Sequence, residues 1–176
     1  MGESGKKWEK LIYFTPYFKL MANLIGVFDL KVDSKGRFIF PASLRKQLLD
    51  ETETGFVMKR SIFNQCIELF PFSTWQKEAE QVGKLNRFVK KNNDFIRMFM
   101  SGSRQVSTDE AGRLLIPRDL MLFGNIGKDI VLASAIDRIE IWSKDAYEAF
   151  VAAGSNTFPS LAEEVMGLPD NNAEKQ

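Results

Sequence analysis

The sequence predicts an α+β protein whose β-rich core is built from two tandem copies of one unit. A short loop occurs twice, as "DSKGR" at 33–37 and as "DEAGR" at 109–113. Each loop lies between apolar runs that alternate with polar residues, which is the period of a strand. Helical sequence separates the two copies and follows the second. Because a unit of about 50 residues buries too little surface to be stable alone, we expect the copies to pack together as a pseudo-twofold pair.

The repeat keeps its spacing along the chain. When "VDSKGRFIFPASL" is laid over "TDEAGRLLIPRDL", the matched pairs are Asp33 with Asp109, Gly36 with Gly112, Arg37 with Arg113, Pro41 with Pro117 and Leu44 with Leu120. Further along, "CIELF" aligns with "RIEIW", which pairs Glu68 with Glu140. A repeat with constant internal spacing indicates one structural unit used twice.

Each copy reads as short strands with one helix. Apolar residues alternate with polar ones over 28–32 and resume after the loop at 38–40, which predicts a strand on each side of a turn. Pro41 and Pro117 suit the first position of a short helix. Two further strands complete each unit, at about 56–60 and 66–70 in the first copy and at about 130–134 and 138–142 in the second.

Helices are expected between and after the copies. Ser73 and Gln76 have the spacing of a capping box, and Gly83 would end the helix that they begin. A second helix is expected over about 88–100, ending at Gly102, with a core-facing side formed by Phe88, Phe95 and Phe99. The C-terminal helix would begin after Ser143 as N-cap and end at Gly154, and "LPDNNAEKQ" would be a frayed tail.

The predicted organisation therefore has five parts. They are an N-terminal extension outside the fold at 1–21, the first repeat at 27–74, a helical spacer at 75–102, the second repeat at 103–146, and the C-terminal helix and tail at 147–176. Residues 1–20 match neither copy, and Met21 would be a natural start. We therefore expect these residues to come from an upstream start.

Composition excludes most enzyme chemistries. The chain has no histidine and a single cysteine, so Ser–His and Cys–His nucleophiles, disulfides and most metal sites are absent, and we expect no cofactor, metal site or small-molecule substrate. Cys66 lies in an apolar run and is expected to be buried and inert. Glu68 and Glu140 are the only symmetric strand carboxylates, and we expect them to be paired or solvated rather than catalytic. No apolar run approaches the roughly 20 residues of a membrane helix.

The repeated loop has a structural and a functional interpretation. Gly36 and Gly112 permit the positive φ that such a turn needs, and the aspartates can cap turn amides. Arg37 and Arg113 could pair back on Asp33 and Asp109 to stiffen the loop. Alternatively, each arginine could fork onto a phosphate or onto the O6 and N7 atoms of guanine.

The duplication favours the functional interpretation. An exposed ion pair contributes only about 0–1 kcal/mol, whereas two equivalent arginines on a pseudo-twofold body suit a repeating ligand such as double-stranded DNA. Lys35 adds charge to the first loop, while Glu110 and Ala111 leave the second less basic, so we expect unequal contributions. The net charge of +1 does not decide the matter. The most basic stretch is either a solvated helix face or a set of phosphate contacts, and comprises Lys84, Arg87, Lys90, Lys91 and Arg97.

A resemblance rests on several stretches of the chain: the loop "VDSKGR" with its apolar strand and proline, the second loop "DEAGRLLIP", the strands "IELFP" and "IEIW", and the helical spacer. Together they resemble the MraZ family of bacterial transcriptional regulators over about residues 22–153. The resemblance implies a tandem pair of SpoVT-AbrB-like, swapped-hairpin units in one chain, assembled into a ring homo-oligomer. Both DxxxR motifs are intact, as Asp33 with Arg37 and Asp109 with Arg113. The departures are the first twenty residues and Val32, where the family often has leucine.

The resemblance also implies a function. Family members bind short direct repeats in the promoter of their own division and cell-wall gene cluster through the DxxxR arginines, and repress it. This implies a cytoplasmic, nucleoid-associated DNA-binding protein. The alternative is an AbrB-like protein-interaction module of the antitoxin type, without specific DNA readout. The long helical spacer and the tandem copies count against this alternative.

Overall fold

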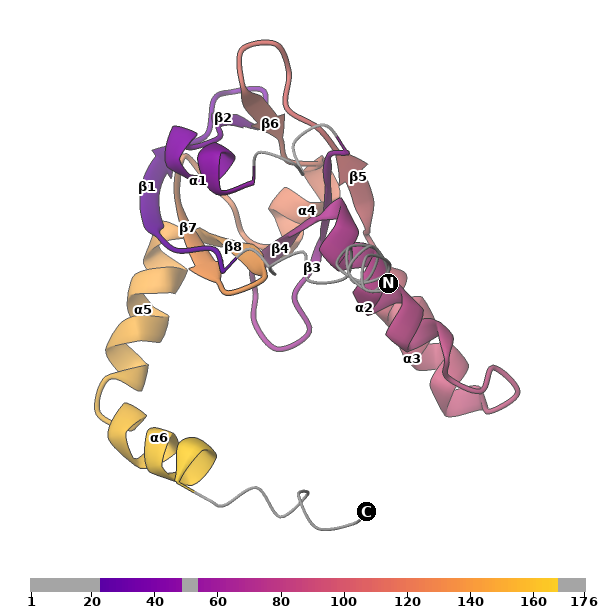
Figure 1. Ribbon diagram of the computed structural model, residues 1–176. Helices are drawn as coiled ribbons and strands as arrows, with labels where there is room; N and C mark the ends of the chain where they lie inside the picture. The colour runs from indigo at the N-terminus through magenta and orange to yellow at the C-terminus, as the bar shows by residue number, and fades with distance from the viewer. Residues whose placement is uncertain (1–22, 49–53, 168–176) are drawn as a thin grey trace, which may run out of the picture.

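The computed structural model describes residues 23–48 and 54–167. The expected N-terminal extension, the proposed start at Met21 and the tail from residue 168 onward lie outside the described residues. Within the described part of the chain, strands make two antiparallel sheets, two short helices lie on the core, and the other helices form two arms (Figure 1). None of the described helices is both long and apolar enough to cross a membrane.

The larger sheet interleaves the two repeats. In sheet order its strands are β1 (Val27–Lys31), β7 (Asp129–Ala135), β8 (Arg138–Ser143), β4 (Ile67–Pro71), β3 (Phe56–Arg60) and β5 (Arg104–Val106). β1 of the first repeat pairs with β7 of the second, and β5 of the second repeat pairs with β3 of the first. Strands β4 and β8 join the halves along their shared edge. The predicted α+β pair of tandem repeats is confirmed, with strands exchanged between them.

The smaller sheet is a two-stranded ribbon with one strand from each repeat. β2 (Arg37–Ile39) pairs with β6 (Arg113–Leu115) in antiparallel register. The central residues, Phe38 and Leu114, are almost completely buried. Burying a side chain of this size contributes about 1.5–3 kcal/mol, so these two residues hold the ribbon on the core.

A short helix follows the ribbon strand in each repeat. α1 (Ala42–Gln47) follows Pro41 and α4 (Arg118–Phe123) follows Pro117. Each proline is the N-cap and not the first helical residue, so each helix begins one residue later than expected. Leu44 and Leu120, which the repeat aligns, are both fully buried in the main core. The helices therefore close the core symmetrically.

The helical spacer differs in detail from the prediction. α2 (Phe72–Gly83) begins after Pro71, and no side chain caps it, so the predicted Ser73–Gln76 capping box is wrong. Proline at the N-cap sets the start of the helix and places Ser73 inside its first turn. α2 ends at Gly83, where a stop was predicted.

The second spacer helix has a smaller apolar face than the sequence predicted. α3 (Lys90–Met100) begins after Phe88, which is fully exposed, and Phe95 is partly exposed. Phe99 is buried and stacks on Trp75 with ring centroids 5.5 Å apart. The prediction of three core phenylalanines is therefore correct for Phe99 and wrong for Phe88 and Phe95. Residue 88 precedes the helix and does not follow its period, and Phe95 lies at the exposed edge of the face that buries Phe99.

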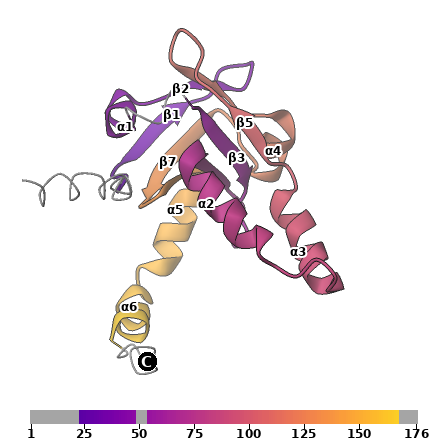
Figure 2. The same cartoon turned by 45° about the vertical axis from the view of Figure 1, so that its right-hand side comes forward.

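The C-terminal arm contains one helix more than predicted. α5 (Lys144–Gly154) begins after Ser143 as expected, although the Ser143 side chain makes no capping hydrogen bond. α6 (Phe158–Met166) then follows, where the sequence predicted no helix. Figures 1 and 2 show the α2–α3 arm and the α5–α6 arm projecting from the same end of the core.

Cys66 is buried at the start of the β4 region, as predicted. Burial is the main factor that raises the pKa of its thiol to about 12, and the nearby Glu140 adds to it. The thiolate is therefore negligible at neutral pH, which makes Cys66 inert.

Candidate nucleic-acid interface

The first DxxxR loop is closed by its aspartate. Oδ1 of Asp33 accepts hydrogen bonds from the backbone N–H groups of Lys35 and Arg37, each at 2.9 Å. Oδ2 accepts a bond from Nε of Arg37 at 2.9 Å and lies 2.8 Å from Nη2 of the same guanidinium. The backbone N–H of Asp33 also donates to the carbonyl of Arg37 at 2.8 Å. One carboxylate thus fixes both the turn and the arginine side chain.

The second loop repeats this geometry. Oδ1 of Asp109 accepts from the N–H groups of Ala111 at 3.0 Å and Arg113 at 2.9 Å, and Oδ2 accepts from Nε of Arg113 at 2.8 Å. The pairing of each arginine with its own aspartate, one of the two interpretations that the sequence left open, is therefore present in both loops. It does not bury the arginines, because their side chains remain 27% and 36% exposed for Arg37 and Arg113.

The two aspartates titrate below their ordinary range. The side-chain hydrogen bond from Arg37 is the largest factor that lowers the pKa of Asp33 to about 2. The pKa of Asp109 is also lowered, chiefly by the backbone N–H of Arg113. Both carboxylates are therefore ionised at physiological pH, and the loops keep this geometry there.

Glycine is required at the fourth position of both loops. Gly36 has a φ of +83° and Gly112 a φ of +72°, a region that other residues rarely adopt. The predicted role of these glycines in shaping the turn is consistent with their conformation. Between them they let the chain reverse directly into the arginine that begins each ribbon strand.

The ribbon brings the two loops to one end of the molecule. The loops enter the antiparallel strands β2 and β6 from opposite directions, and Figures 1 and 2 show both projecting from the end opposite the helical arms. The carbonyl of Gly36 accepts from Ile116 at 2.9 Å, and the carbonyl of Gly112 accepts from Phe40 at 3.0 Å. Each loop is thus hydrogen-bonded to the strand of the other repeat.

Two apolar residues share the outer face of the ribbon with the arginines. Because side chains alternate along a strand, Arg37 and Ile39 lie on the face opposite buried Phe38. Their cross-strand partners are Leu115 and Arg113 respectively. Ile39 is 63% exposed and Leu115 51% exposed. This face therefore carries an arginine and an aliphatic side chain from each repeat in symmetric positions.

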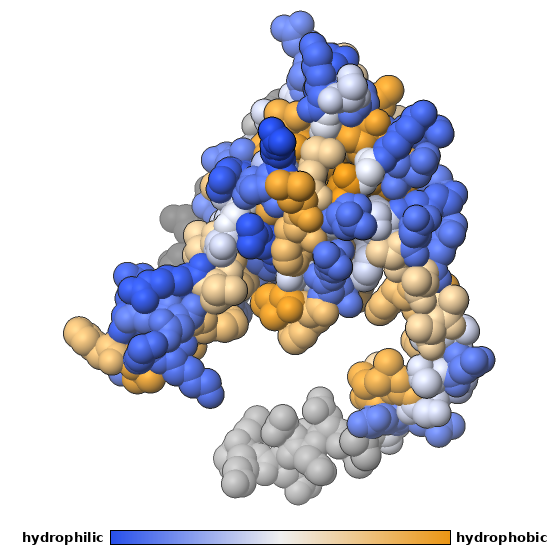
Figure 3. Space-filling model, turned by 180° about the vertical axis from the view of Figure 1, so that it is seen from behind, coloured by the Kyte–Doolittle hydropathy of each residue, from blue (hydrophilic) through white to orange (hydrophobic). Residues whose placement is uncertain are grey.

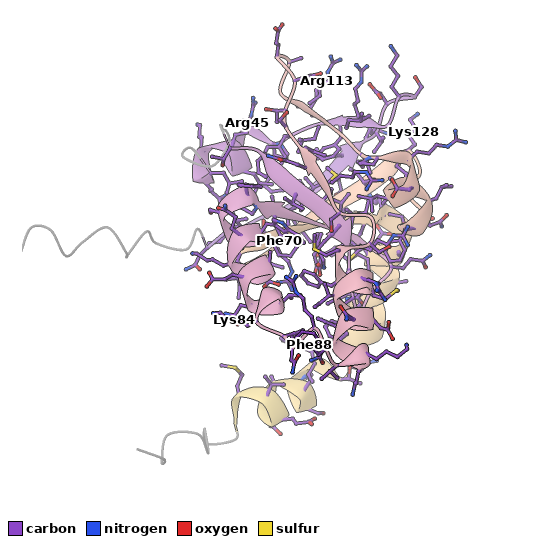
Figure 4. The ribbon with its side chains drawn as sticks, turned by 90° about the vertical axis from the view of Figure 1, so that its right-hand side faces the viewer. Arg45, Phe70, Lys84, Phe88, Arg113 and Lys128 are labelled. Atoms are coloured by element: carbon purple, nitrogen blue, oxygen red, sulfur yellow. The ribbon has the colours of Figure 1, made fainter. Side chains whose placement is uncertain are left out.

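Sequence reasoning did not identify Ile39 and Leu115 as surface residues. The available signal was a break in the period, since "RFIF" and "RLLI" are apolar at positions where an outward-facing residue is expected. Lys35 is exposed in the first loop. Lys128, which the sequence did not single out, is exposed at the same end of the molecule (Figure 4), and its carbonyl accepts from the N–H of Val32.

The spacer cations lie far from the loops within one chain. Figure 4 shows Lys84 at the opposite end of the molecule from Arg113. Lys84 forms an ion pair with Glu80 at 3.5 Å, and Lys90 pairs with Asp94. The structure thus brings Arg37, Arg113 and Lys35 to one end of the molecule. The other candidate phosphate contacts lie on the α2–α3 arm at the opposite end, and are Lys84, Arg87, Lys90 and Lys91.

The strand carboxylates Glu68 and Glu140 lie elsewhere. Glu68 is buried and pairs with Nζ of Lys59 at 2.7 Å. Glu140 accepts the indole N–H of Trp142 at 2.9 Å. Both groups are engaged with neighbours in the sheet, as the sequence led us to expect. Their partners, Lys59 and Trp142, are themselves strand residues of the larger sheet. Both carboxylates therefore belong to the sheet and not to the loop surface.

Comparison with known proteins agrees with this architecture. The family model described as "MraZ protein, putative antitoxin-like" matches twice, over residues 24–98 and 98–166. A protein from Flavobacterium psychrophilum named transcriptional regulator MraZ is 52% identical over 147 residues, covering 84% of this chain and 94% of the relative. The protein of the same name from Christiangramia forsetii is 51% identical over 150 residues, covering 85% and 97%. With two matches in tandem, one for each repeat, the chain belongs to the MraZ family.

Proposed function

We propose that this protein is a DNA-binding transcriptional regulator that contacts duplex DNA through its two DxxxR loops. The observation that carries the proposal is the mounting of Arg37 and Arg113 on the outer face of one ribbon, each oriented by its own aspartate. An exposed loop would not need such a device for stability, since surface ion pairs contribute little. The names of the relatives, transcriptional regulators, support the same conclusion.

The chemistry of the outer face suits DNA. Each aspartate binds one edge of its guanidinium, and the remaining N–H groups are oriented for a phosphate or for the O6 and N7 acceptors of guanine. A two-stranded ribbon fits the major groove, and aliphatic side chains such as Ile39 and Leu115 suit contact with thymine methyl groups. The face therefore offers both positioning and base-reading contacts.

Specific binding by this protein depends on assembly. One chain has a net charge of only +1 and two short loops, so few counterions would be released on binding. A ring that presents many loop pairs along a duplex would sum weak contacts into a strong one. Short direct repeats in the promoter of its own division and cell-wall gene cluster would match such a ring, and binding there would repress the cluster. The protein would then lie with the nucleoid in the cytoplasm.

The two arms are suitable surfaces for ring contacts. Phe88 and Met98 are exposed on the spacer arm, and α5 and α6 expose Phe150, Phe158, Leu161 and Val165 on the other. Figure 3 shows hydrophobic side chains at the surface of the C-terminal arm. Two different apolar arms on one chain permit a head-to-tail contact, which is the type that generates closed rings.

The proposal is tested by fluorescence anisotropy with DNA from upstream of the protein's own gene and with a scrambled duplex of equal composition. We expect the wild type to prefer its own promoter and the double variant Arg37→Ala, Arg113→Ala to lose this preference. The control variant Lys46→Ala, Lys77→Ala removes the same charge outside the loops and should bind as the wild type. Light scattering establishes that assembly is unchanged.

Two outcomes would reject the proposal. Equal weak binding to both duplexes would show that the protein does not read sequence, and full binding by the double variant would show that the arginines only brace their turns. Either result would favour the antitoxin-type alternative, for which the exposed apolar arms would be the docking surface for a protein partner.

A further inference from the structure

Arg45 of the first repeat lies against the DxxxR loop of the second. A Cβ placed on Gly112 would be 2.7 Å from Nη1 of Arg45 and 3.3 Å from its Cζ. The guanidinium therefore packs directly on the backbone of the loop that carries Arg113. Figure 4 shows Arg45 and Arg113 towards the same end of the molecule. This contact crosses the boundary between the repeats and joins residues that are far apart in the chain.

The equivalent contact on the other side has no charge. The repeat alignment that pairs Arg37 with Arg113 places Met121 at the position of Arg45. The Sδ atom of Met121 lies 3.0 Å from a Cβ placed on Gly36. Each short helix thus covers the loop of the other repeat, but only α1 brings a cation to it.

The charge within the two loops differs in the opposite sense. The first loop carries Lys35 within the turn, whereas Glu110 and Ala111 occupy the corresponding part of the second. Asp109 already holds Arg113, and among the described residues no carboxylate forms an ion pair with Arg45. Arg45 is only partly buried, and its guanidinium lies against the second loop.

We propose that Arg45 is a DNA-contacting residue of the second loop, where it supplies from the other repeat the cation that Lys35 supplies within the first. The two loops then each present a DxxxR arginine and one additional cation. This inference rests on the proposed DNA binding and extends it to a residue outside the repeated loop. It also revises the expectation that the second loop is the weaker one, which counted only residues within each loop.

The test compares the salt dependence of binding for four variants. Arg45→Met installs the residue found at the equivalent position, Arg45→Lys keeps the charge, and Lys46→Met removes an adjacent exposed charge as the control. Met121→Arg places a second cation over the first loop. Affinity for promoter DNA is measured by anisotropy across a sodium chloride series, and thermal unfolding of each variant establishes that it is folded.

We expect Arg45→Met to weaken binding several-fold and to make the slope of log K against log salt concentration shallower by about 0.9 for each phosphate that is no longer neutralised. Arg45→Lys should keep most of the slope, and Lys46→Met should leave slope and affinity unchanged. Met121→Arg should steepen the slope by a similar amount, which tests the inference even if Arg45→Met is unstable.

An unchanged slope in Arg45→Met, with or without weaker binding, would overturn the inference and make Arg45 a residue that only covers Gly112. A Lys46→Met variant with the same decrease in affinity and slope as Arg45→Met would overturn it as well. If Arg45→Met binds normally while the Arg37, Arg113 double variant does not, this inference fails and the proposed function stands. If the double variant also binds normally, the proposed function itself fails.

Discussion

Glu68 on β4 lies directly opposite Glu140 on β8, at the seam where the two repeats join. Like charges in this arrangement repel. Lys59 compensates for the buried member of the pair, with Nζ 2.7 Å from Glu68 and 4.8 Å from the ring centroid of Phe99. The same lysine thus stabilises the seam and contacts the helix α3 that packs beside it.

Replacement of Lys59 should therefore destabilise the protein. Lys59→Met removes the nearest cation from the buried Glu68 and leaves it with the hydroxyl of Ser61 and with Nε of Arg138 at 3.7 Å. We therefore expect the free energy of unfolding to fall by up to about 3 kcal/mol. Urea denaturation at fixed protein concentration measures this change, with the exposed Lys77→Met as control. Adding Glu68→Leu to Lys59→Met should restore much of the stability, and a double variant no more stable than the single one would contradict the explanation.

The loop glycines should resist substitution for reasons of backbone conformation. Gly36→Ala and Gly112→Ala each force a side chain into the positive-φ region, which costs about 1–3 kcal/mol. A Cβ on Gly36 would also approach the carbonyl oxygen of Ile116 to 3.3 Å. Gly83→Ala is the matched control, because it meets open space at the end of α2 and should be neutral or stabilising. Thermal unfolding measures these changes in stability, and a Gly36→Ala variant as stable as the wild type would contradict the explanation.

The first loop should respond to acid in a defined window. The pKa of Asp33 is lowered from 3.8 to about 2 in the folded protein. Between these two pH values the carboxylate of the folded protein is mostly charged, whereas that of the unfolded chain is mostly protonated. Its stabilising contribution is therefore complete above about pH 3.8 and is lost as pH falls through about 2. NMR titration of the Asp33 side-chain carbon measures the midpoint directly.

Removal of the guanidinium supplies the control for this titration. In Arg37→Ala the midpoint of Asp33 should move up towards the ordinary aspartate value, because the side-chain hydrogen bond is the largest cause of the shift. It should not reach that value completely, since the N–H groups of residues 35 and 37 still donate to Oδ1. A midpoint unchanged by the substitution would refute the assignment of cause.

Arg37→Ala on its own should nearly abolish specific DNA binding without unfolding the protein. The turn keeps the backbone hydrogen bonds to Asp33, and the central ribbon residue Phe38 stays buried. Anisotropy with promoter DNA measures the decrease in affinity, and circular dichroism and light scattering measure fold and assembly. Retained operator affinity in the folded variant would refute the role of this arginine.

The apolar arms should be needed for assembly but not for folding. Phe158→Asp and Leu161→Asp place charge on exposed apolar positions of α6, and we expect light scattering to report a smaller particle. Thermal stability at low protein concentration should change little, because neither side chain belongs to the described core clusters. The exposed Glu163→Gln serves as control, and an unchanged mass in both aspartate variants would exclude α6 from the contact.

Much of the fold could be predicted because its signals are local. Alternation of apolar residues identified the strands, and Pro41 and Pro117 marked the starts of α1 and α4. The errors arose where local signals competed. Pro71 began α2 ahead of the predicted cap at Ser73, and Phe88 lay outside the helical period that would have buried it. α6 was missed although Phe158, Leu161 and Val165 have the i, i+3, i+7 spacing of a helix, and these side chains remain exposed in the structure.

The two repeats, the glycine turns and the identity of the DxxxR residues follow from the amino-acid sequence alone, since these depend on short-range chemistry and on spacing within one segment. Three other relationships are visible only in the folded protein: β1 pairs with β7, Ile39 and Leu115 share a face with the arginines, and Arg45 covers Gly112. These relationships join residues from different repeats. They follow from how two half-cores bury their apolar faces against each other, which no local pattern encodes.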